Sequence, residues 1–195
     1  VHRSTRGWSY GASVRDPRTG EIIKGHVSLG SLRVRQDFLI AQGLLSPYEN
    51  GATNPDEKML QLALARLRQL SAHEIGHTIG LAHNFAASVK DRSSVMDYPH
   101  PYITLDAGGN LDFSKSYAVG IGEWDKRTVL YGYQDFPEGT NEAAALQRIL
   151  AGNHEMGFEY ISDRDARPQS GAHPTAHLWD GGENPATEKR LITLL

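Results

Sequence analysis

The segment His73–His83 constrains the fold of this chain more than any other feature. It reads His-Glu-Ile-Gly-His-Thr-Ile-Gly-Leu-Ala-His and contains three of the nine histidines. On an α-helix, His73 and His77 would lie about 40° apart around the axis and about 6 Å apart along it. Two imidazoles in that arrangement can bind one metal ion.

His83 can join the other two histidines only if the helix ends before it. In a continued helix, His83 would be rotated by about 240° from His77 and would lie about 9 Å further along the axis. Gly80 lies between them, and glycine adopts positive φ angles without a steric penalty. We therefore predict a helix that ends near Gly80 and a chain that turns back to bring three imidazoles together.

Three neutral imidazoles with a fourth position open are typical of a catalytic zinc site, whereas structural zinc sites are closed. Zinc lowers the pKa of a bound water to about 7. Glu74 points about 100° away from His73 around the helix, so it can take a proton from that water and pass it to a leaving amine. A core helix that contains histidines by chance is one alternative, and the five fixed positions make such a chance match rare. A structural zinc site is the other, and it would leave Glu74 and the open position without a purpose.

Length, net charge and the lack of cysteine exclude several classes of protein. The chain has 195 residues, which suits one domain or one domain with an appendage. Its 20 Lys and Arg against 23 Asp and Glu give a net charge of −3, which argues against a nucleic-acid partner or an anionic membrane surface. The absence of cysteine excludes disulfides and thiolate zinc ligands. No apolar run reaches the roughly 18 residues of a membrane span.

Local patterns predict the elements around the histidines. The runs Trp8–Arg15 and Glu21–Leu29 flank a Pro- and Gly-containing turn and predict a β-hairpin. Asn54 and Pro55 predict the start of the long helix that continues into the histidine segment. Further predictions are a short helix in Arg33–Leu45, a hairpin turn at Asp106–Asn110, and helices over Gly122–Tyr131, Thr140–Ala151 and Asn184–Leu195.

The spacing of His73, Glu74, His77, Gly80 and His83 resembles the long zinc signature of the metzincin metallopeptidases. Zn²⁺ is the cofactor that this resemblance implies, with the three histidines as its ligands, Glu74 as the general base and Gly80 supporting the turn. The segment Glu123–Gly132 resembles the helix that closes metzincin catalytic domains.

Metzincins also place a methionine turn beneath the metal, and Ser94–Tyr98 (Ser-Val-Met-Asp-Tyr) resembles that turn. The resemblance implies that Met96 forms a hydrophobic floor under the site. It also implies that Tyr98 stabilises an oxyanion, as in astacin-like and serralysin-like members, where the tyrosine can also ligate zinc at rest. A tyrosine that only packs beneath the loop is the alternative.

The implied fold is an α+β zincin-like catalytic domain over residues 1–195. Its upper half, 1–80, would hold a small twisted sheet and the long active-site helix above a cleft. Its lower half, 81–133, would be rich in loops and helices, followed by an extension over 134–195 that matches no well-known branch. The strand around Gly25–Leu29 would be the edge that pairs with an extended peptide.

The implied function is that of a zinc-dependent endopeptidase acting on proteins or peptides. Two alternatives stay open: a zinc-containing module that binds peptides or proteins without cleaving them, and a zinc amidohydrolase with a non-peptide substrate. The overall texture resembles a bacterial family of large exported proteins with an embedded metzincin domain. We therefore expect a piece of a longer chain that is extracellular, periplasmic or on the cell surface.

Several polar residues near the signature have open roles. Asp97 could orient a ligand histidine or stabilise its own turn. The pair Asp163 and Asp165 reads as acidic turn residues, with calcium binding as the alternative. Asn84 directly follows the third histidine, where several metzincin branches have an acidic residue.

Overall fold

The computed structural model describes residues 8–45, 57–166, 173, 176–181 and 186. The fold is α+β, with two small two-stranded sheets and several helices. The described residues form two compact units. The first contains the chain up to Gly80 together with residues 101–120, and the second contains residues 81–100 and the chain from Ile121 onward.

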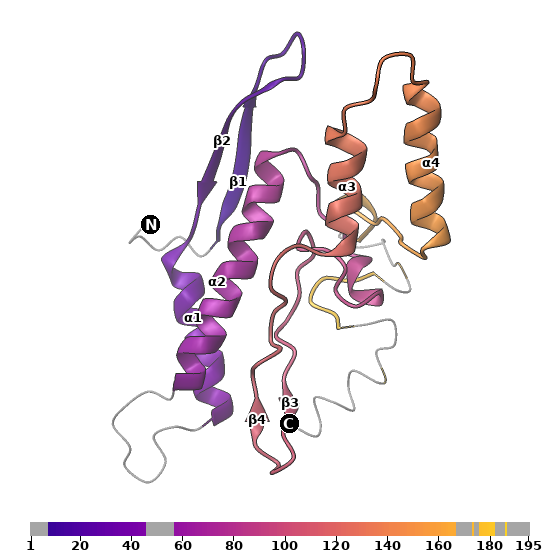
Figure 1. Cartoon of the computed structure of the whole chain (residues 1–195). Helices are drawn as coiled ribbons and strands as arrows, with labels where there is room; N and C mark the ends of the chain where they lie inside the picture. Colours follow the sequence, from indigo (N-terminus) through magenta and orange to yellow (C-terminus); the bar gives the residue numbers. More distant parts are fainter. Residues whose placement is uncertain (1–7, 46–56, 167–172, 174–175, 182–185, 187–195) are drawn as a thin grey trace. The chain divides into compact units, whose positions relative to one another are not determined.

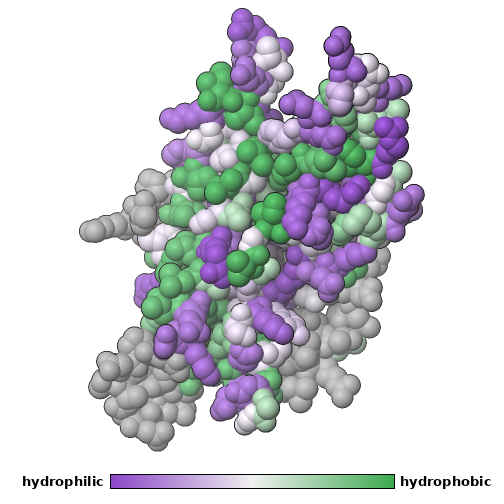
Figure 2. All heavy atoms as spheres, in the orientation of Figure 1, coloured by the Kyte–Doolittle hydropathy of each residue, from purple (hydrophilic) through white to green (hydrophobic). Residues whose placement is uncertain are grey.

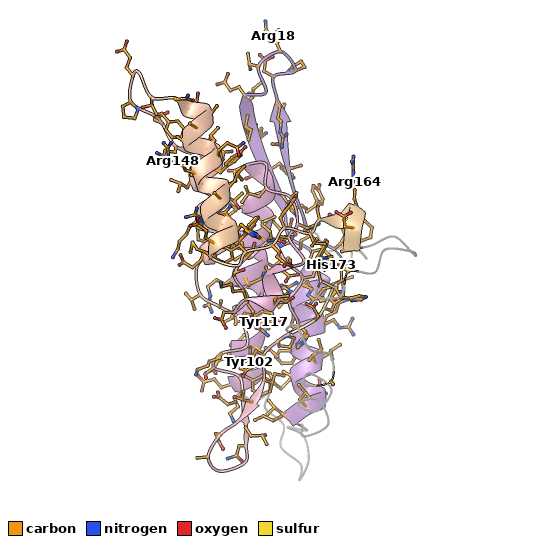
Figure 3. The ribbon with its side chains drawn as sticks, turned by 90° about the vertical axis from the view of Figure 1, so that its right-hand side faces the viewer. Arg18, Tyr102, Tyr117, Arg148, Arg164 and His173 are labelled. Carbon is orange, nitrogen blue, oxygen red and sulfur yellow. The ribbon has the colours of Figure 1, made fainter. Side chains whose placement is uncertain are left out.

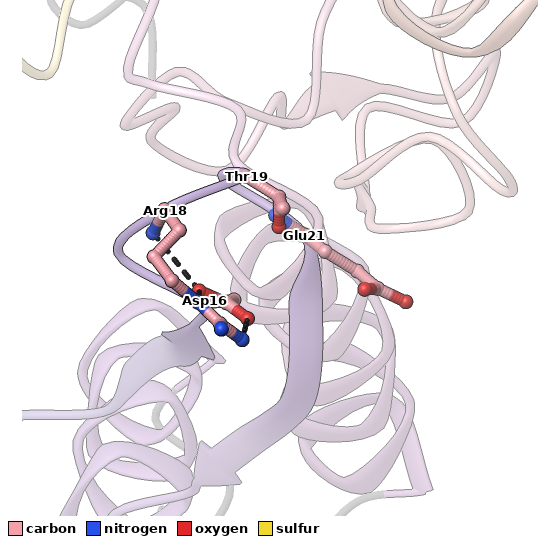
Figure 4. A network of polar contacts seen from close by, with 4 residues as sticks. All are labelled: Asp16, Arg18, Thr19 and Glu21. Carbon is pink, nitrogen blue, oxygen red and sulfur yellow. Dashed lines mark hydrogen bonds and ion pairs between the residues drawn. The ribbon is translucent and has the colours of Figure 1, made fainter.

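The first unit begins with an antiparallel hairpin of β1 (Tyr10–Arg15) and β2 (Ile22–Ser28), as the sequence predicts. Its turn is held by Asp16, whose carboxylate accepts hydrogen bonds from the Arg18 backbone N–H at 2.9 Å and from its guanidinium at 2.7 Å (Figure 4). Arg18 extends from the tip of the hairpin (Figure 3). The turn thus supplies its own charge pairing at the surface.

Two helices form the body of the first unit. α2 (Glu57–Thr78) is the long helix that the sequence predicts, and α1 (Ser31–Leu45) lies along it (Figure 1). The predicted cap at Asn54 lies outside the described residues. A short hairpin of β3 (Thr104–Leu105) and β4 (Leu111–Asp112) surrounds the predicted turn. The buried core of the unit consists of Ala41, Met59, Leu62, Phe113 and Tyr117.

Charged groups are buried beside this core. Arg66 of α2 is 4% exposed, and its guanidinium lies over the ring of Tyr117, 5.4 Å from the centroid. Figure 3 shows Tyr117 beside the long helix. Burial lowers the pKa of Arg66 and raises the pKa of Asp37, which pairs with Arg33 at 3.3 Å. The buried face of α2 therefore contains a charged side chain, Arg66, before the histidine segment begins.

The second unit contains the remaining helices: α3 (Glu123–Tyr133), α4 (Glu142–Glu155), α5 (Asp163–Ala166) and the 3-10 turn η2 (Ala87–Val89). Its core is a cluster of Phe85, Ala86, Ala166 and Ala176.

The sequence predicts both α3 and α4, but the predicted C-terminal end of α4, at Ala151, comes earlier than the observed end at Glu155. Asn141 caps α4 by accepting a hydrogen bond from the Ala144 N–H at 3.0 Å. The helix then runs through Gly152, where we expected it to stop, and the chain turns at Gly157 with φ 71°. The predicted helix from Asn184 to Leu195 lies outside the described residues, except for the single residue Ala186.

Apolar side chains gather on the α1 and α2 side of the first unit in Figure 2. Exposed apolar residues of these two helices include Leu39, Ile40, Leu60 and Leu64. Among the described residues, no helix is long and apolar enough to cross a membrane.

Candidate zinc site

The long helix ends just before Gly80, the second glycine of the histidine segment. α2 ends at Thr78, and Gly80 has a φ of 93°, a conformation that side chains with a Cβ rarely adopt. The Gly80 N–H donates to the His77 carbonyl at 3.1 Å, which satisfies one of the last carbonyls of the helix. The chain leaves the helix at this point and proceeds to His83.

His73 and His77 project from one face of α2. Their Nε2 atoms lie 3.1 Å apart, and His73 is 3% exposed. Ring nitrogens of His73, His77 and His83 all lie within 4.8 Å of one another. Two nitrogens bound at 2.0–2.1 Å to one tetrahedral zinc would be about 3.3 Å apart, so the spacing of the first pair fits that ion.

The third histidine has a carboxylate partner that no sequence pattern predicts. Nδ1 of His83 lies 2.7 Å from Oδ2 of Asp163, the first residue of α5. An imidazole whose Nδ1–H donates to a carboxylate presents Nε2 as its free lone pair. The sequence predicts only an acidic turn residue at Asp163, because no local pattern links it to a histidine 80 positions earlier.

Glu74, the predicted general base, lies on α2 directly after His73 and is 4% exposed. Burial raises the pKa of Glu74 from 4.5 to about 7, opposed by a hydrogen bond from the Gly11 backbone N–H and by the charge of Arg66. A carboxyl group with a pKa near neutrality can both accept and release a proton. Strand β1 therefore contacts the carboxylate of the predicted general base.

The segment that resembles the methionine turn is tied to the residue after the third histidine. Met96 is 1% exposed, and its carbonyl accepts a hydrogen bond from the Asn84 N–H at 3.1 Å. Asp125 of α3 fixes the same turn, because its carboxylate accepts from the Ser94 hydroxyl at 2.6 Å and from the Val95 N–H at 2.8 Å.

Tyr98 packs directly on a candidate ligand. Its ring meets the ring of His83 edge to face, with centroids 4.7 Å apart. On another side the Tyr98 ring stacks with the Trp179 ring, with centroids 5.3 Å apart and an interplanar angle of 26°. The backbone N–H of Trp179 also donates to the Tyr98 carbonyl at 3.2 Å. Trp179 has a φ of 64° and is 48% exposed. Sequence patterns did not single out Trp179.

A sequence model of the Met-zincin family matches residues 55–193, well over half of the chain. The chain belongs to the Met-zincin family. This membership confirms the predicted metzincin character and the zincin-type α+β fold, and the histidine cluster fits the zinc signature of the family. No curated protein and no solved structure matches the chain.

The match also covers a part of this Met-zincin chain that our resemblance left unassigned. The resemblance leaves the extension over residues 134–195 without a match, whereas the family match continues to residue 193. Both Asp163 and Trp179 therefore lie within the region that defines the family.

Asn84, where several metzincin branches have an acid, has a physical reason to be an amide here. Its Nδ2 donates to the Glu159 carbonyl at 3.0 Å, and its Oδ1 accepts from the N–H groups of Ala86 at 3.2 Å and Ile161 at 3.1 Å. Asn84 is 1% exposed. A carboxylate could accept but could not donate, so it would leave the Glu159 carbonyl without this bond.

Asp97 stabilises its own turn, one of the two roles that the sequence left open. Its carboxylate accepts from the Tyr98 N–H at 2.6 Å and from the backbone of Ser88. Burial raises the pKa of Asp97 to about 7, and the nearby Asp180 raises it further. The carboxylate that contacts a histidine of the cluster is instead Asp163.

Proposed function

We propose that this Met-zincin chain is a zinc-dependent endopeptidase. The observation that supports the proposal most strongly is the grouping of ring nitrogens from His73, His77 and His83 within 4.8 Å, with Glu74 next to the first of them. Three imidazoles leave a fourth position of a tetrahedral ion open, which a catalytic site needs and a structural site lacks.

Glu74, Tyr98 and Met96 each have a separate role in the proposed hydrolysis of a peptide bond. When bound, zinc would lower the pKa of a water to about 7 and polarise the carbonyl of the substrate. Glu74 accepts a proton from the attacking water and later gives it to the leaving amine nitrogen. The Tyr98 hydroxyl donates a hydrogen bond to the developing oxyanion, and Met96 forms the apolar floor.

An extended peptide is the substrate that the first unit favours. Among the described strands, β2 pairs only with β1, so its outer edge has backbone groups available for a further strand. Gly25 of β2 lies against Thr78, where an added Cβ would be 2.9 Å from the Thr78 Cβ, so the strand passes close to the end of α2. The proposal includes a location outside the cytoplasm, as metzincin resemblance implies.

The test is cleavage of a reduced, unfolded protein by the zinc-loaded chain. We compare the parent with Glu74→Gln, and use Glu57→Gln as the matched control because Glu57 is exposed at the other end of the same helix. Loss of the general base should reduce kcat about 10²- to 10⁴-fold, whereas Glu57→Gln should retain parental activity. Mass spectrometry of the fragments would identify the cleaved bonds.

The other outcomes separate the alternatives. Equal cleavage by the parent and Glu74→Gln would contradict the mechanism. Stoichiometric zinc binding without cleavage of any protein would contradict the endopeptidase and favour a peptide-binding module. Hydrolysis of small acylated amines without cleavage of proteins would favour the non-peptide amidohydrolase.

A further inference from the structure

Asp163, in the C-terminal part of the chain, contacts the third candidate zinc ligand. Oδ2 of Asp163 lies 2.7 Å from Nδ1 of His83, a distance typical of a charge-assisted hydrogen bond. The His83 side chain is 14% exposed and that of Asp163 is 41% exposed, so solvent only partly competes for the bond. Arg164, the next residue, extends away from α5 (Figure 3).

The contact belongs to a longer junction between two chain segments. The residues after His83 are held against the residues before Asp163 by backbone and amide hydrogen bonds. Phe85 N–H donates to the Ile161 carbonyl at 2.8 Å, and the Asn84 amide bonds to both Ile161 and Glu159. Ala166, at the end of α5, packs in the same apolar cluster as Phe85. These hydrogen bonds and the apolar cluster hold the backbone on both sides of Asp163 in place.

The bond also selects the nitrogen that His83 offers to a metal. With Nδ1–H donating to Asp163, Nε2 is the ring nitrogen that has no proton, the same atom that His73 and His77 direct toward each other. Carboxylates that accept from a ligand histidine fix its tautomer and ring orientation and make it a stronger ligand. Asp97, the acid that the sequence offers as a partner for a ligand histidine, accepts hydrogen bonds from the backbone of Tyr98 and Ser88 instead.

We propose that Asp163 is a positioning residue that orients His83 for zinc, so that the C-terminal segment completes the metal site. The inference rests on the zinc-binding part of the proposed function and not on peptidase activity. It predicts that the region after Tyr133 is required for tight metal binding.

The test is the zinc affinity of the whole chain, measured by competition with a zinc chelator at fixed pH. Asp163→Ala should bind zinc about 10- to 100-fold more weakly than the parent. Asp163→Asn should lose less, because an amide oxygen can still accept from Nδ1–H. The matched control is Asp165→Asn, on the same short helix, which should bind as the parent does.

A second readout separates positioning from a general structural role. Long-range ¹⁵N–¹H NMR of the histidine rings reports which nitrogen holds the proton. The Nδ1–H signal of His83 should be lost or averaged in Asp163→Ala and retained in Asp165→Asn. The thermal unfolding midpoint of the metal-free chain should change little, because Asp163 is partly exposed.

The outcomes distinguish this inference from the proposed function. A parent chain that binds no zinc would overturn the proposed function itself. A parent that binds zinc, together with an unchanged affinity in Asp163→Ala, would overturn the role of Asp163. Equal weakening in Asp165→Asn would overturn it as well.

Discussion

Gly11 of β1 and Glu74 of α2 approach so closely that no side chain fits between them. A Cβ atom added at Gly11 would lie 2.0 Å from the Glu74 carbonyl oxygen and 2.9 Å from the His77 Cβ. The Gly11 N–H also donates to the Glu74 carboxylate. The first strand therefore fixes the helix turn that contains the candidate base and two candidate ligands.

Gly11→Ala should disturb both the fold and the site, because backbone atoms must move to admit the methyl group. We expect the free energy of unfolding to fall by about 1–3 kcal/mol, measured by urea denaturation, and cleavage to weaken with it. Gly43→Ala is the control, since Gly43 lies in α1 with no atom within 4 Å of an added Cβ. It should stabilise the chain by about 0.5–1 kcal/mol. A neutral Gly11→Ala would contradict the close packing.

Asp125 connects the methionine turn to the start of α3. Its carboxylate is 2% exposed and accepts hydrogen bonds from Ser94, Val95 and the Gly122 N–H. Asp125→Ala would remove these three hydrogen bonds from a largely buried site and should cost about 3 kcal/mol or more in urea denaturation. Glu123→Ala, in the same helix turn but exposed, should change the unfolding free energy by less than about 1 kcal/mol. Similar effects for the two variants would contradict the role of Asp125.

Tyr98→Phe tests the hydroxyl apart from the ring. The phenyl ring can keep its contacts with His83 and Trp179, so zinc affinity and folding should stay at parental levels. If the hydroxyl stabilises the oxyanion, kcat should fall about 10²- to 10³-fold with little change in KM. An unchanged kcat would favour the alternative in which Tyr98 only packs beneath the loop.

Asp97 should make stability depend on pH. Its pKa is about 7 in the folded chain against an ordinary value of 3.8, so the folded state holds the proton more tightly. The carboxyl group therefore stabilises the fold fully below about pH 4, and this contribution is lost as the pH rises through 7. Asp97→Asn, which can still accept from the Tyr98 N–H, should remove that dependence.

The measurement is urea denaturation of the metal-free parent and of Asp97→Asn between pH 4 and pH 8. Relative to the parent, the variant should gain up to about 4 kcal/mol across this range. Asp180, whose pKa burial also raises, and Arg92 are present in both proteins. A difference that does not vary with pH would contradict the raised pKa of Asp97.

The predictable parts of this molecule are those set by neighbours in sequence. The hairpin follows from its turn residues, α2 from its apolar run, and the exit from the helix from Gly80. The contacts of Asp163 with His83 and of Asp125 with Ser94 join residues 80 and 31 positions apart. An aspartate that accepts such a bond looks the same in the sequence as one in a surface turn, so only the fold identifies the partners.

X-ray absorption at the zinc edge tests the proposed three-histidine site, because it counts the ligands of the metal in the loaded chain. We expect one zinc per chain with three imidazole nitrogens at about 2.0–2.1 Å and one oxygen from solvent. Replacing His83 by Ala should reduce the imidazole count to two. A metal shell without a solvent oxygen, or one that keeps three imidazoles after His83 is replaced, would contradict a catalytic zinc site built on His73, His77 and His83.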